Sequence, residues 1–153
     1  MKIKYQFELA DQRELSFVID LARPNSANLG KGAPAWTELS FQKCPTCPLA
    51  ENACFSCPAA VDVTAIVSDF ASLLSYDQAH VTVTAGDREI RRHCDVQIGL
   101  KSILGVVMAT SGCPVLSKFR GMANFHLPFA SLEETVVRTV RYNRILCLRR
   151  KVA

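Results

Sequence analysis

The sequence is organised around residues 44–58, which read CPTCPLAENACFSCP. This stretch holds two Cys-x-x-Cys pairs, and only six residues separate the pairs. Four thiolates at this spacing are the usual ligand set of a tetrahedral zinc ion. The pattern therefore predicts a metal knuckle over residues 44–58, with Cys44, Cys47, Cys54 and Cys57 as its ligands.

The metal in this knuckle is expected to be Zn²⁺, and an iron–sulfur cluster is the alternative because four thiolates also hold such clusters. A closed zinc site with four protein ligands is structural, and its binding free energy, on the order of 10 kcal/mol or more, is coupled to folding. The competing interpretation is four buried or partly oxidised thiols. Pro58 suits the first position of a helix, which would place Cys57 at the N-cap.

Composition predicts an ordinary globular chain. The 153 residues are enough for a single domain over residues 1–153, the apolar fraction is 49%, and the net charge is only +4. Seven cysteines, an odd number, favour reduced thiols over a secreted disulfide framework. The N-terminus has no signal-peptide pattern, and the apolar stretch 98–116 is too interrupted to span a membrane, so a cytoplasmic protein without a membrane span is expected.

Alternation of apolar and polar residues predicts strands in the first half of the chain. One hairpin is expected from residues 3–9 and 15–21, and a second from residues 79–85 and 88–94. Residues 36–42 alternate in the same way and predict a third strand that leads into the knuckle, with Leu39 and Phe41 facing inward.

Apolar residues at helical spacing predict about four helices that pack on this sheet. They are expected over residues 58–75, 95–112, 113–122 and 131–150. The last helix begins with Ser131, whose spacing to Glu134 fits a capping box. The fold class is therefore α+β, an antiparallel sheet from two hairpins plus a third strand, packed by helices and carrying a four-cysteine metal knuckle.

Cys113 and His126 are candidates for catalysis. A thiol at the start of the helix predicted from residue 113 would have a lowered pKa, and His126 could act as its base or add a ligand to the metal. The alternative is a buried thiol and a capped loop histidine, and no established catalytic motif surrounds either residue. A thiol-dependent or redox enzyme is thus the second hypothesis, behind a protein that is not an enzyme.

The last predicted helix, residues 131–150, is basic. Its cations are Arg138, Arg141, Arg144, Arg149, Arg150 and the following Lys151. They could contact nucleic acid or an acidic partner, but the aromatic residues that stack on single-stranded bases are missing. A solvated helix face is the preferred interpretation, with nucleic-acid binding as a minor alternative.

Four motifs carry a resemblance to a known family. They are CPTCPL (44–49), CPAAV (57–61), ATSGCP (109–114) and FHLPFAS (125–131). Together they resemble a family of small bacterial proteins of uncharacterised function, in which the position of Cys54 can be histidine, another zinc ligand. The resemblance implies a metal site and no activity. We therefore expect a zinc-stabilised binding or regulatory module that has a protein partner.

Overall fold

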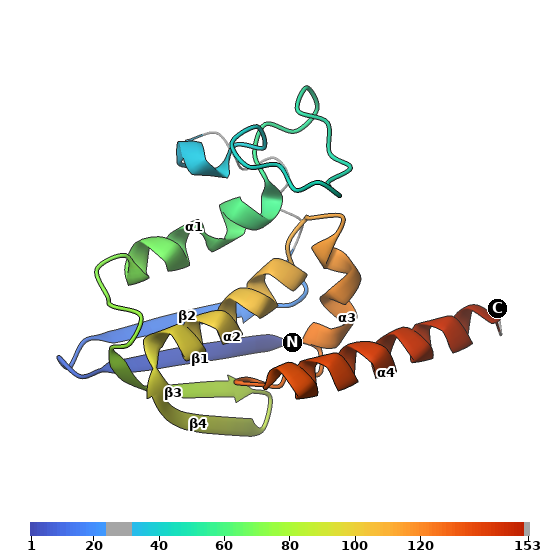
Figure 1. Ribbon diagram of the computed structural model, residues 1–153. Helices are drawn as coiled ribbons and strands as arrows, with labels where there is room; N and C mark the ends of the chain where they lie inside the picture. The colour runs from blue at the N-terminus through green and yellow to red at the C-terminus, as the bar shows by residue number, and fades with distance from the viewer. Residues whose placement is uncertain (24–31, 152–153) are drawn as a thin grey trace.

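A computed structural model describes residues 1–23 and 32–151 of the chain (Figure 1). The strands are β1 (Lys2–Leu9), β2 (Glu14–Asp20), β3 (Gln78–Ala85) and β4 (Arg88–Asp95). The helices are η1 (Ala35–Thr37), α1 (Pro58–Phe70), α2 (Val96–Ala109), η2 (Leu116–Phe119), α3 (Arg120–Ala123) and α4 (Leu132–Lys151). The predicted α+β class and both predicted hairpins are confirmed.

The sheet is antiparallel throughout, with the strand order β2-β1-β3-β4. Its central strand β1 alternates as the sequence predicts: Ile3, Tyr5 and Phe7 are fully buried, while Lys4 and Glu8 are exposed on the other face. A strand exposes successive side chains to opposite faces, so this alternation gives the sheet one buried side.

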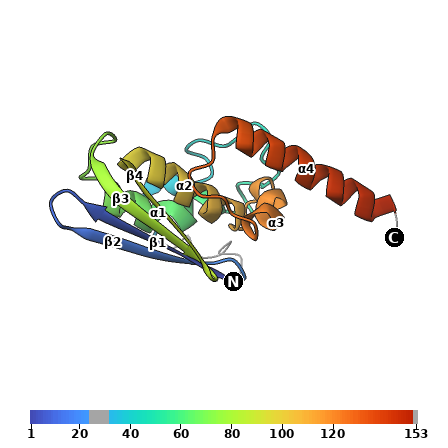
Figure 2. The same cartoon turned by 90° about the horizontal axis from the view of Figure 1, so that it is seen from below.

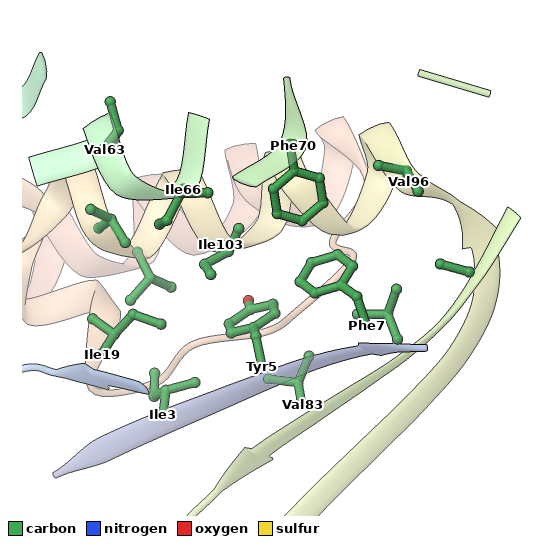
Figure 3. Close-up of a cluster of buried hydrophobic side chains, with 14 of the residues drawn as sticks. Ile3, Tyr5, Phe7, Ile19, Val63, Ile66, Phe70, Val83, Val96 and Ile103 are labelled. Carbon is green, nitrogen blue, oxygen red and sulfur yellow. The ribbon is translucent and has the colours of Figure 1, made fainter. Parts of the chain in front are cut away.

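Helices α1 and α2 cover the buried side of the sheet (Figure 2). Phe70 of α1 meets Phe7 of β1 edge to face, with 5.0 Å between ring centroids. Figure 3 shows this core, and the Tyr5 hydroxyl lies on the side of its ring that points toward the helices. Tyr5 thus brings one polar atom into an apolar layer, and a buried hydroxyl requires a hydrogen-bond partner.

The prediction of a third strand over residues 36–42 is wrong. Residues 35–37 form the short helix η1, and only an isolated bridge joins Glu38 to Ser56. Leu39 is buried as predicted and donates its amide to the Phe55 carbonyl at 2.9 Å, but Phe41 is 64% exposed. The segment closes the base of the cysteine loop instead of extending the sheet.

The helix ends follow the sequence at some sites and depart from it at others; α2, predicted to end at residue 112, ends at Ala109. Cys57 is the N-cap of α1 with Pro58 next, and Ser131 and Glu134 form the capping box before α4, with the Glu134 amide 3.1 Å from Ser131 Oγ. Helix α1 ends at Phe70 and not at Ser75. The helix predicted over residues 113–122 is replaced by η2 and the four-residue α3.

Helix α4 projects from the body of the molecule, and its C-terminal end lies far from the sheet (Figures 1 and 2). Leu132, Val136 and Val140 follow one another at i, i+4 spacing on α4 and are 81%, 52% and 60% exposed. The apolar side of this helix therefore faces solvent. None of the helices within residues 1–23 and 32–151 has the length and apolar character that a bilayer span requires.

Candidate functional site

The four knuckle cysteines lie in one surface loop. Cys44 is exposed, Cys47, Cys54 and Cys57 are partly buried, and all four are free thiols. The Cys47 amide donates to the Cys44 carbonyl at 2.9 Å, which closes a turn within the first pair. Within the described ranges, however, no three Cys, His, Asp or Glu side chains lie together as a metal-binding group. The residues that the structure describes therefore do not show the predicted four-cysteine metal knuckle, which stays a prediction.

The structure places Cys113 and His126 in different surroundings. Cys113 precedes η2, which begins only at Leu116, so it does not occupy the helix N-terminus on which its predicted reactivity depended. His126 lines a pocket whose lining does not include Cys113, and its Nε2 lies 2.5 Å from the hydroxyl of Tyr5. The histidine predicted as a partner for a thiol thus has a phenol as its neighbour.

A chain of hydrogen bonds joins Tyr5 to two helical segments. The Tyr5 hydroxyl lies 2.8 Å from Ser102 Oγ on α2 and 2.5 Å from His126 Nε2 in the loop after α3. Ser102 Oγ also accepts the amide N–H of Phe129 at 3.3 Å. These hydrogen bonds involve residues 5, 102, 126 and 129, so they join β1 to α2 and to the loop after α3.

Burial favours the neutral forms of Tyr5 and His126. It raises the pKa of Tyr5 well above the ordinary value of a phenol. Burial, and secondly the positive charge of Arg138, lower the pKa of His126 to about 4. We assign the hydrogens from the geometry: Ser102 donates to Tyr5, Tyr5 donates to Nε2, and His126 keeps its proton at Nδ1. In this arrangement the hydroxyl hydrogens of Ser102 and Tyr5 are both donated in hydrogen bonds.

His126 forms part of the wall of a pocket of about 780 Å³ that lies between α2, the segment η2–α3, and α4. Pockets of this size hold small organic molecules. Its apolar wall comes from the end of α2 and from η2–α3, and consists of Met108, Ala109, Leu116, Phe119, Met122 and Ala123. An apolar ligand body could be buried against this wall.

The wall from α4 is polar. Ser131, Thr135, Arg138 and Thr139 line it and share one helix face. Arg138 Nη2 donates to the carbonyls of Met122 and Phe125, which fixes α4 against the end of α3. Helix α4 thus lines the pocket with its polar side, next to the stripe of exposed apolar residues.

Three cations from three elements line the pocket: Arg92 of β4, Lys101 of α2 and Arg138 of α4. The part of the chain that the structure describes contributes no Asp or Glu to the lining. The same residues show no ion pair between these cations and a carboxylate. Since like charges in a pocket raise its positive potential, the pocket should attract anions.

The loop that carries His126 is strained at Phe129. This residue has φ of 60°, in the left-handed region that a side chain with a β-carbon rarely adopts. The Phe129 ring contacts the guanidinium of Arg92, 5.8 Å from the ring centroid, and its amide binds Ser102. Strain of this kind persists where surrounding contacts hold it, and here both contacts belong to the pocket wall.

The candidate nucleic-acid cations do not form one surface. Arg138 faces the pocket and is partly buried, whereas Arg141 and Arg144 are exposed. Arg149 and Arg150 belong to α4, but their side chains lie outside the described part of the structure. Of the six cations, Arg138 thus lines the pocket, and nucleic-acid contact by the C-terminal arginines stays a prediction.

Sequence reasoning missed Tyr5, Ser102, Lys101 and Arg92 as site residues. A signal for Ser102 was present, because it interrupts the otherwise apolar series Ile98, Ser102, Val106 on one face of a largely buried helix. Tyr5 was expected in the core, but its hydroxyl partners lie 97 and 121 residues away in the chain. No local pattern indicates such a pairing.

Comparison with known proteins gives a family and no activity. The family described as "Domain of unknown function (DUF6901)" matches residues 3–151. No curated protein and no solved structure matches the chain.

Proposed function

The chain belongs to the DUF6901 family. From the pocket beside His126 we propose that it is a small-molecule-binding domain whose ligand occupies this pocket. The observation that carries the proposal is the pocket itself, about 780 Å³ with an apolar wall, a polar wall and a partly buried, hydrogen-bonded histidine. Pockets that bind ligands combine a largely apolar lining with a few placed polar groups.

The hydrogen bonds that position His126 in the pocket wall also support a binding function. A domain could bury Tyr5 more simply as phenylalanine, because each buried polar group requires a partner. Instead, Tyr5, Ser102 and the Phe129 amide hold His126 in one orientation at the pocket surface. Polar networks of this kind stabilise one arrangement of the groups that they join.

Gly105 provides a direct test because it lines the pocket and a β-carbon at this position meets no atom within 4 Å. Gly105→Phe should place its ring in the pocket, whereas Gly105→Ala should leave most of the volume open. We expect a neutral apolar fluorophore such as Nile red to bind the wild type and the alanine variant, and to bind the phenylalanine variant at least about tenfold more weakly. Equal binding to all three proteins would place the dye elsewhere and refute the proposal.

A second proposal concerns the cysteine loop, in which zinc would have a structural role. It is supported by the chemistry of the donors, since four free thiols occur as two Cys-x-x-Cys pairs in one loop. The bonds at the base of the loop also support it: Leu39 N–H to the Phe55 carbonyl, and Cys57 N–H to the Thr37 carbonyl at 2.7 Å. They hold the two ends of the loop together before any ion binds.

The described positions of the thiols fit a zinc ion only in part. The donor type is right, but no group of three donors converges in residues 1–23 and 32–151, so binding requires the second pair to approach the first. At present Cys54 Sγ lies 3.1 Å from the Ser56 carbonyl and not in a shared site. An iron–sulfur cluster stays the alternative to zinc for the same four residues.

Other sequence-based predictions have no support in the described geometry and stay predictions. These are catalysis by Cys113 with His126, a protein partner, nucleic-acid contact through the C-terminal arginines, and a cytoplasmic location. The pocket proposal requires none of them. It is a proposal of binding, and it assigns no reaction.

A further inference from the structure

We propose that the ligand of this pocket is an amphipathic anion, a molecule with one acidic head group on an apolar body. This inference rests on the proposed binding function and adds the chemical class of the ligand. It follows from how charge and apolar surface are distributed along the pocket.

The polar side chains that α2 contributes to the lining lie in its first half, beside Ile98, and the lining near its end is apolar. Lys101 and Ser102 line the pocket near the first half of α2, and Met108 and Ala109 line it near the end. With a rise of about 1.5 Å per residue, Lys101 and Met108 are separated by about 10 Å along the helix axis. A ligand that lies along α2 would therefore have its head beside Lys101 and its tail beside Met108.

The lining from β4, the loop after α3 and η2 has the same distribution, whereas the wall from α4 is polar. Ser102 is bonded through Tyr5 to His126, and Arg92 contacts Phe129, whose amide binds Ser102, so these groups surround one end of the pocket. Leu116 and Phe119 follow α2 in the chain and line the apolar wall. A ligand with charge at both ends would place a charge against this apolar wall, which is unfavourable.

The head group is an anion because the charged side chains of the lining have one sign. Lys101 and Arg92 are exposed, and no carboxylate of the described residues lines the pocket with them. Arg138 uses one nitrogen, Nη2, for both of its carbonyl contacts, and a guanidinium carries five N–H groups. A carboxylate or phosphate oxygen accepts hydrogen bonds from all of these donors, whereas an ammonium head would be repelled.

Calorimetric titration with ligands of equal chain length tests this inference. Decanoate and decyl phosphate carry the two acidic heads, decanol is neutral, and decylammonium is cationic. We expect at least one of the two anions to bind the wild-type protein about tenfold or more tightly than decanol, and decylammonium to bind most weakly. The better of the two anions identifies the head group.

Lys101→Met and Lys118→Met form a matched pair of variants. Both lysines are exposed, but only Lys101 lines the pocket. Lys101→Met should weaken binding of the preferred anion about fivefold or more and leave decanol unchanged, while Lys118→Met should change neither. Thermal melts confirm that both variants fold.

The outcomes separate this inference from the proposed function. If Nile red binds in a manner that depends on Gly105 but decanol or decylammonium binds as tightly as both anions, the anion inference is wrong and the pocket function stands. Equal losses in Lys101→Met and Lys118→Met would likewise overturn the inference, because the effect would then come from net charge. If neither the dye nor any decyl compound binds at the pocket, the proposed function itself fails.

Discussion

Gly99 of α2 lies directly over the ring of Phe7 in β1. A β-carbon at position 99 would overlap the edge of that ring and come within 3.1 Å of Val81 Cγ2. Both neighbours are fully buried, so neither can move freely. The absence of a side chain at this position sets how closely α2 approaches the sheet, and it therefore fixes the position of Ser102 one turn along the helix.

This contact predicts opposite results for two glycines of the same helix. Gly99→Ala should lower the free energy of unfolding by about 1–3 kcal/mol because the core is overpacked. Gly105→Ala, which has open space around its β-carbon, should be neutral or stabilising by up to about 1 kcal/mol through helix propensity. Urea unfolding of both variants measures the difference, and equal effects would contradict the close approach at Gly99.

The lowered pKa of His126 predicts a loss of stability in acid. The histidine titrates near 6.5 in the unfolded chain and at about 4 in the folded protein, so between these values only the unfolded chain binds the proton. Stability should therefore fall as the pH drops from about 6.5 to about 4, by on the order of 2–3 kcal/mol.

The variant His126→Gln isolates this contribution, because glutamine does not titrate and other groups are unchanged. Urea unfolding at about pH 7 and about pH 4.5 should show a loss in the variant that is smaller than in wild type by about 2 kcal/mol. The same loss in both proteins would mean that folding does not lower the pKa of His126.

The Tyr5 hydroxyl should contribute to stability through its two partners. Tyr5→Phe removes the hydrogen bond of His126 Nε2 and one hydrogen bond of Ser102 Oγ, and leaving polar atoms unpaired in the interior costs about 1–3 kcal/mol. Tyr76→Phe is the control, because Tyr76 is 66% exposed. Equal melting temperatures for the two variants would show that the hydrogen bonds of the Tyr5 hydroxyl do not stabilise the fold.

Zinc in the cysteine loop predicts a specific order of stabilities. Protein purified without chelator should contain about one equivalent of zinc, and Cys57→Ser should lose both the metal and much of the stability. Cys54→His should keep both, since imidazole is also a zinc ligand, and Cys113→Ser, outside the loop, should keep the metal. Equal melting temperatures for all variants, with or without chelator, would show that the cysteines do not organise the fold.

Alkylation with iodoacetamide tests the predicted role of Cys113. Cys94 is 7% exposed, and burial raises its pKa, so it should react slowly in the folded protein. If Cys113 is a reactive thiol, mass spectrometry should find it modified well before Cys94 near neutral pH. Resistance of Cys113 until the protein unfolds would end the hypothesis of thiol-dependent catalysis.

Local sequence patterns were sufficient to predict the elements that depend on interactions between residues close in the sequence. Alternation predicted the two hairpins, and the spacing from Ser131 to Glu134 predicted the start of α4. The prediction from the alternation over residues 36–42 was wrong because an alternating pattern does not show whether a neighbouring strand is available for pairing. Here a single bridge at Glu38 takes the place of a strand. Leu39 is buried against the rest of the fold, but Phe41 has no sheet to face.

The candidate site depended on contacts between distant segments. His126 was a candidate because it lies near Cys113 in the sequence, but its neighbour in the structure is Tyr5. The observed partner, Tyr5, comes from the opposite end of the chain, and the cations Arg92, Lys101 and Arg138 come from three elements. Only tertiary packing brings such groups together, so no window of sequence could have combined them.

Helix α4 resembles a lever whose short arm is the polar wall of the pocket. Beyond Thr139 it continues to Lys151 for about 18 Å of helix and projects from the body (Figure 1). A small rotation at its base, where Arg138 holds the end of α3, becomes a larger displacement at its tip. Conversely, a force applied to the tip or to the exposed residues Val136 and Val140 would widen or narrow the pocket without any contact with its ligand.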